Sequence, residues 1–141
     1  MKSFLVGIKT MRDVAFAIFK YKERMKEVYD KTGIKEYKEL ADEADRYKIK
    51  DLLRLNLKAI QHRYGAEDEV REEQYIEYSN SNFTTSYEQA FKSIRCLLYQ
   101  LNVDGDDEVM DATDFLNRVA SFLAYEIAIE ASKDKKYYWG D

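Results

Sequence analysis

Not one of the 141 residues in this chain is proline. Proline interrupts helix interiors because it lacks a backbone N–H and its ring clashes with the preceding turn. A chain without proline, and with only five glycines, favours long helices joined by short connections. The sequence therefore predicts an all-α fold, a helical bundle of four to five helices. Residues 2–8 are predicted to form either a short strand or an extended N-terminal arm.

Apolar residues recur at helical spacing along most of the chain, and the length fits a single domain spanning residues 1–141. The pattern also predicts a break near Arg46–Lys50, because the apolar positions before it do not continue in phase after it. Thr10 and Thr85 are the expected N-caps, and Gly33 is the expected stop of the first helix. The main helices are predicted at residues 10–31, 35–64, 85–101 and 107–132.

The segment 84–101, TTSYEQAFKSIRCLLYQL, carries the strongest amphipathic pattern. One face is apolar, with Tyr87, Ala90, Phe91, Ile94, Leu97, Leu98 and Leu101. The opposite face mixes two cations with a thiol and an aromatic ring, at Lys92, Arg95, Cys96 and Tyr99. This mixture is unusual for a purely solvated surface, so we expect the helix to make contacts on both sides.

Charge and cysteine content limit the classes of partner. The net charge of −4 argues against a nucleic-acid surface. No stretch approaches the roughly 20 apolar residues of a membrane span. A single cysteine fits a reducing compartment. These features predict a cytoplasmic protein with no membrane or nucleic-acid partner, and no metal or cofactor is expected.

The predicted last helix is apolar on two sides. One row contains Leu116, Val119 and Leu123, and a second row at heptad spacing contains Phe115, Phe122 and Ile129. A helix with two apolar sides is either central in its domain or shared with a second subunit. We therefore expect a homodimer, with Phe115, Phe122 and Ile129 at the interface.

Known catalytic patterns fit the chain poorly. A calcium loop beginning at Asn102 would have Asp107 where glycine is needed and Thr113 where a bidentate glutamate is needed. All-α magnesium pyrophosphohydrolases use paired Glu-x-x-Glu and Glu-x-x-Asp turns, for which the candidates are Glu69 with Glu72 and Glu108 with Asp111. Carboxylates at such positions more often solvate a loop or complement a helix dipole.

A second kind of pattern, cations interleaved with aromatic rings, suits a planar anion or an acidic protein surface. The alternative is structural, with Lys92 and Arg95 paired to Glu88 or to the acidic segment 67–73. Asn56 belongs to a half-polar row with Arg63 that is expected to line a pocket. The candidate binding residues are Asn56, Arg63, Tyr64, Lys92, Arg95, Tyr99, Gln100 and Trp139.

The same residues resemble a group of small, mostly uncharacterised proteins of phages, prophages and plasmids. Shared features are an Asn…Arg-Tyr stretch, a Cys-x-x-Tyr-Gln helix and a Trp-Gly near the end. The matching residues here are Asn56, Arg63, Tyr64, Lys92, Arg95, Cys96, Tyr99, Gln100, Trp139 and Gly140. The resemblance implies a small accessory protein of a mobile element, a setting in which inhibitors of host defence are common.

Three functional hypotheses follow. The leading one is a non-enzymatic protein that inhibits a bacterial defence system by binding a host component, as anti-CRISPR proteins do. The second is a sequestering module for a nucleotide-like anionic ligand. The third is a magnesium-dependent all-α nucleotide pyrophosphohydrolase.

Overall fold

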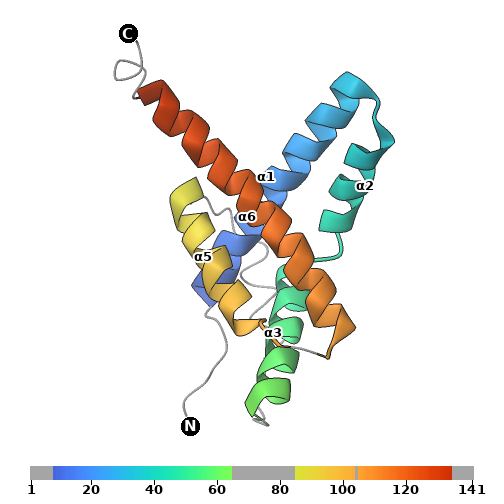
Figure 1. The fold of residues 1–141 in the computed structure, drawn as a ribbon, viewed down its shortest axis with the longest axis vertical. Helices are drawn as coiled ribbons and strands as arrows, with labels where there is room; N and C mark the ends of the chain where they lie inside the picture. Colours follow the sequence, from blue (N-terminus) through green and yellow to red (C-terminus); the bar gives the residue numbers. More distant parts are fainter. Residues whose placement is uncertain (1–7, 65–84, 104, 135–141) are drawn as a thin grey trace.

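The fold is an all-α bundle, as the sequence predicts (Figure 1). The computed structural model describes residues 8–64, 85–103 and 105–134, and these residues contain no strand. Of the segment 2–8, predicted as a strand or an arm, only Ile8 is described, and it begins α1. Residues 66–82, which the sequence places between two predicted helices, lie outside the described residues. None of the described helices combines the length and apolar character that a membrane crossing requires. The described helices are α1 (Ile8–Thr32), α2 (Lys35–Ala44), α3 (Ile49–Tyr64), α5 (Tyr87–Gln100) and α6 (Asp107–Asp134).

A tight turn at Gly33 folds α2 back along α1 (Figure 1). Gly33 has a φ of 69°, and its N–H donates to the Tyr29 carbonyl at 2.7 Å. This is the usual way in which a helix ends at a glycine, because the left-handed conformation is strained for residues with a Cβ. The predicted stop of the first helix is confirmed.

The predicted helix 35–64 is two helices, separated by residues 45–48. The Lys48 N–H donates to Asp51 Oδ2 at 3.1 Å, so the start of α3 has its own cap. Tyr47, inside the break, stacks on the Phe115 ring with a centroid distance of 4.6 Å. The change in apolar phase near Arg46–Lys50 therefore marks a true break, at which the chain turns to place an aromatic ring in the core.

Helix α6 is central to the bundle and contacts α1, α3 and α5. Phe115 is fully buried, and its ring meets Tyr21 of α1 edge-on at 5.8 Å. Phe122 is partly buried and packs against Tyr21 and Tyr87. The prediction that Phe115 forms an oligomer interface is thus wrong, because its side chain is fully buried among helices of the same protomer. Phe122 is only partly buried, and Ile129 lies farther along α6, beyond this cluster. For these two residues the interface, and with it the homodimer, stays a prediction.

Replacing Phe115 by alanine should destabilise the protomer without changing its mass in solution. Loss of a buried phenylalanine costs about 3–5 kcal/mol, because the cavity is filled only in part by relaxation of its neighbours. Urea unfolding measures the stability, and light scattering measures the mass. Ile129→Ala is the control, since Ile129 lies outside the aromatic cluster. A Phe115→Ala protein of unchanged stability but altered oligomeric state would restore the interface prediction.

A buried polar contact joins α1 to α5. Asp13 is 1% exposed, and its Oδ2 accepts hydrogen bonds from Ser93 Oγ at 2.7 Å and from Gln89 Nε2 at 3.4 Å. The observed helix starts differ from the expected ones. Helix α1 already begins at Ile8, before Thr10. At the start of α5 the capping side chain is Ser86, not Thr85, and its Oγ accepts a hydrogen bond from the Gln89 N–H at 3.0 Å. Asp13 therefore fixes one helix on another and does not complement the start of α1.

The variant Ser93→Ala should lose about 1–3 kcal/mol of unfolding free energy, because the buried Asp13 carboxyl group loses its shortest hydrogen bond. Ser121→Ala, an exposed serine on α6, is the matched control and should stay within about 0.5 kcal/mol of the wild type. Denaturant unfolding monitored by circular dichroism gives both values. Equal stability of the two variants would mean that the contact does not hold α5.

Candidate functional site

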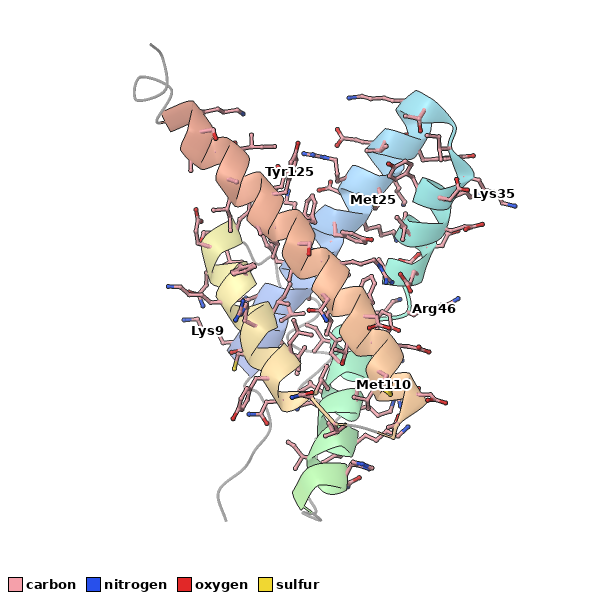
Figure 2. All side chains as sticks on the ribbon, viewed as in Figure 1. Lys9, Met25, Lys35, Arg46, Met110 and Tyr125 are labelled. Carbon is pink, nitrogen blue, oxygen red and sulfur yellow. The ribbon has the colours of Figure 1, made fainter. Side chains whose placement is uncertain are left out.

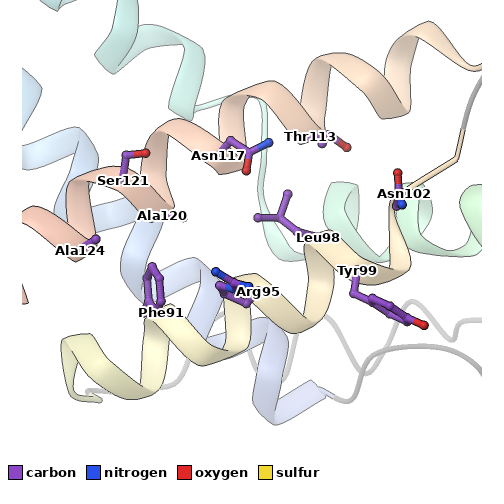
Figure 3. Close-up of a pocket in the computed structure, with 10 residues that line it drawn as sticks. All are labelled: Phe91, Arg95, Leu98, Tyr99, Asn102, Thr113, Asn117, Ala120, Ser121 and Ala124. Atoms are coloured by element: carbon purple, nitrogen blue, oxygen red, sulfur yellow. The ribbon is translucent and has the colours of Figure 1, made fainter.

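A groove of about 630 Å³ runs between α5 and α6 (Figure 3). We call it the α5–α6 groove. Helix α5 supplies the aromatic, aliphatic and cationic side chains, and α6 supplies small and neutral polar ones. A volume of 300–1,000 Å³ is typical of sites for small molecules. The lining residues are Phe91, Arg95, Leu98, Tyr99, Asn102, Thr113, Asn117, Ala120, Ser121 and Ala124.

Arg95 is the cationic residue among those described as lining the groove, and none of these lining residues is acidic. Its guanidinium carbon lies 5.9 Å from the centroid of the Phe91 ring, a cation–π distance. Among the described residues no carboxylate forms an ion pair with Arg95, so the predicted pairing with Glu88 does not occur. The other predicted partner, the acidic segment 67–73, lies outside the described residues. Within the described residues, the groove therefore presents a positive charge that no carboxylate pairs with.

The rotation of α5 explains which residues reach the groove. Ser93 faces Asp13 of α1, and residues two positions apart differ by about 200° around a helix. Arg95 is consequently turned away from α1, towards solvent and α6. Figure 3 places Leu98 between the helices, with Phe91 near one end of the groove and Tyr99 near the other. Tyr99 is 72% exposed, so an aromatic ring stands at the rim.

Other predicted binding residues do not line the α5–α6 groove. Lys92 is exposed on α5 beside it, and Gln100 is half-buried. Asn56 is fully buried in the core, and the pocket expected along its row with Arg63 stays a prediction. Arg63 and Tyr64 end α3, but their side chains lie outside the described part of the chain, as does Trp139.

Sequence reasoning missed the α6 wall of the groove. Thr113, Asn117, Ser121 and Ala124 recur every three or four residues, so they share one face of α6. The signal in the sequence was that this row contains no charged residue, although 35% of the chain is charged. It marks a helix surface that is neither solvated by charges nor filled with large apolar side chains.

Charged residues fasten α3 to the start of α6 away from the groove. Arg54 donates two hydrogen bonds to Glu108, at 2.9 and 3.1 Å, and Lys58 reaches both Glu108 and Asp106 at 3.1 Å. Hydrogen bonds from Arg54, then from Lys58, lower the pKa of Glu108 from 4.5 to about 2. Asp106 accepts from the Val109 N–H at 3.1 Å, a capping contact that lowers its pKa. Glu108, one of the carboxylates considered for a magnesium site, and its neighbour Asp106 are therefore both engaged in structural contacts.

The depressed pKa of Glu108 makes a specific contribution to acid stability. Because the folded pKa lies below the unfolded one, this contribution is complete above pH 4.5 and is lost as the pH falls towards 2. Glu108 is largely exposed, so the effect should be below about 1 kcal/mol. Wild type should therefore lose slightly more stability between pH 5 and pH 2.5 than Glu108→Gln.

Urea midpoints at the two pH values measure this difference. Glu130→Gln is the control, since Glu130 is exposed and contacts only Lys133 of its own helix among the described residues. A Glu108→Gln protein with the full acid sensitivity of the wild type would contradict the assignment.

Comparison with known proteins gives no match to this chain, whether with protein families, with curated proteins or with solved structures.

Proposed function

We propose that this chain is an accessory protein of a phage or other mobile element that inhibits a bacterial defence system by binding a host component. It acts by recognition, not by catalysis. The α5–α6 groove and the adjoining exposed residues of α5 form the binding surface. The carrying observation is the guanidinium of Arg95, which forms no ion pair with any carboxylate of the described residues and lies near the exposed residue Tyr99.

The chemistry of this surface supports binding. Arginine and tyrosine are enriched among the residues that dominate protein interfaces, because each combines a large apolar area with hydrogen-bonding groups. Arg95 is already oriented by the Phe91 ring, which reduces the entropy lost when a partner engages it. The absence of acidic residues from the groove lining favours a host component that presents an anionic group.

The mobile-element setting rests on the resemblance carried by Arg63-Tyr64, Cys96-x-x-Tyr99-Gln100 and Trp139-Gly140. Of these segments, the helix containing Cys96, Tyr99 and Gln100 adjoins the groove. Both the resemblance and the groove therefore involve residues of α5. In that setting the expected host component is a bacterial defence protein or a molecule on which such a protein depends.

Phage plating on bacteria that each carry one defence system tests the proposal. Expression of the chain should raise plating efficiency on at least one such strain. Arg95→Glu should abolish the effect, because it reverses the charge of the groove, and Tyr99→Ala should weaken it roughly 10-fold or more through loss of contact area. Retained protection by both variants would contradict the assignment of this surface.

Two matched variants control for general damage. Tyr125 is 63% exposed on the C-terminal half of α6, away from the groove lining, so Tyr125→Ala removes a comparable ring (Figure 2). Arg46 is exposed between α2 and α3, so Arg46→Glu makes the same charge change elsewhere. Both variants should inhibit as the wild type does. No change in plating on any strain would overturn the proposed function.

A further inference from the structure

The geometry points to a nucleoside monophosphate or a cyclic mononucleotide as the ligand of the α5–α6 groove, with its phosphate on Arg95 and Asn117 and its base beside Tyr99. This inference rests on the proposed role of the groove as the binding surface. It goes further by naming a small anionic metabolite, and not a protein side chain, as the bound group.

The charge of the groove matches one phosphate. Arg95 is the cation among the ten described lining residues, and none of these ten is a carboxylate. A guanidinium presents paired N–H donors whose spacing fits phosphate oxygens. A triphosphate would carry two or three further charges that no lining residue neutralises, in a chain whose net charge is already −4. The groove therefore favours a single phosphate over a polyphosphate.

The wall opposite Arg95 supplies a neutral donor. Figure 3 shows Asn117 of α6 across the groove from Arg95 of α5. Its amide N–H group can donate to a phosphate oxygen that Arg95 already holds. Since Asn117 is exposed on a helix packed against the core, this donor is positioned without ordering a loop. Two donors from two rigid helices then define one anion position.

The end of the groove beyond Leu98 suits a planar ring. Leu98 provides an apolar floor there, Asn102 lies at the end of the groove, and the Tyr99 ring projects outward from α5 at the rim (Figure 3). Stacking of a base on an aromatic side chain is worth roughly 1–3 kcal/mol and tolerates any base. The volume of about 630 Å³ accommodates a ligand of nucleotide size, whereas one carboxylate side chain would leave most of it empty.

Isothermal titration calorimetry on the purified chain tests the inference. The probes are AMP, GMP, CMP, UMP and the 3′,5′-cyclic forms of AMP and GMP, with their nucleosides, the triphosphates and inorganic phosphate for comparison. At least one single-phosphate probe should bind roughly 10-fold more tightly than its nucleoside and than inorganic phosphate. Its triphosphate should bind no more tightly. Absence of binding at millimolar concentration, or any other ranking, overturns the inference.

Variants locate the site. Arg95→Gln should weaken the best probe roughly 10-fold or more by removing a charge-assisted contact, and Tyr99→Ala roughly 5-fold or more by removing the stacking surface. Asn117→Leu should weaken the mononucleotide but leave its nucleoside unaffected. Arg46→Gln and Tyr125→Ala are the matched controls and should bind as the wild type does. Equal binding by all five variants would place the nucleotide elsewhere and overturn the inference.

Two results separate this inference from the proposed function. If no mononucleotide binds but Arg95→Glu still abolishes inhibition in cells, the ligand class is wrong and the binding surface stands. If mononucleotides bind with the expected ranking but no defence system is inhibited, the ligand class stands and the proposed function is wrong. Thermal unfolding of each variant confirms that it is folded before either conclusion is drawn.

Discussion

The buried hydrogen bond from Ser93 to Asp13 determines which side chains of α5 face solvent and α6. It joins α5 to α1 at a position that water does not reach, and Gln89 adds a second contact to the same carboxyl oxygen. A slip of one residue would rotate α5 by about 100° and leave this carboxyl group unsatisfied, which is costly in a core. The contact therefore fixes the rotation that turns Arg95 towards α6.

Helix α6 provides the other wall because its large apolar residues Phe115, Leu116 and Leu123 are buried inside the protomer. Phe115 packs between Tyr47 and Tyr21, which leaves the residues on the far side of the helix to face the groove. Those residues are short and uncharged, among them Asn117, Ser121 and Ala124. They neither fill the space beside α5 nor pair with Arg95. The groove is thus a consequence of how the core is packed.

Arg95 differs from the arginines that form ion pairs between helices. Arg24 is paired with the largely buried Glu126 at 2.6 Å, where α1 meets α6, and Arg118 pairs with Glu43. Such pairs connect helices far apart in sequence, and removing one partner of a buried pair is destabilising. Arg95 contacts an aromatic ring instead, through Phe91 on its own helix. No carboxylate of the described residues pairs with its charge, whereas Arg24 and Arg118 connect helices of the fold.

The sequence by itself determined the helical class, the stop at Gly33, the break before α3 and the apolar face of α5, because these depend on local backbone preferences and on the 3.6-residue period. It also singled out Arg95 and Tyr99. Only the tertiary structure decided that Phe115 and Asn56 are core residues and that Asn117 faces Arg95. Periodicity shows that a helix has two faces, but which neighbour covers each face depends on contacts between residues distant in sequence.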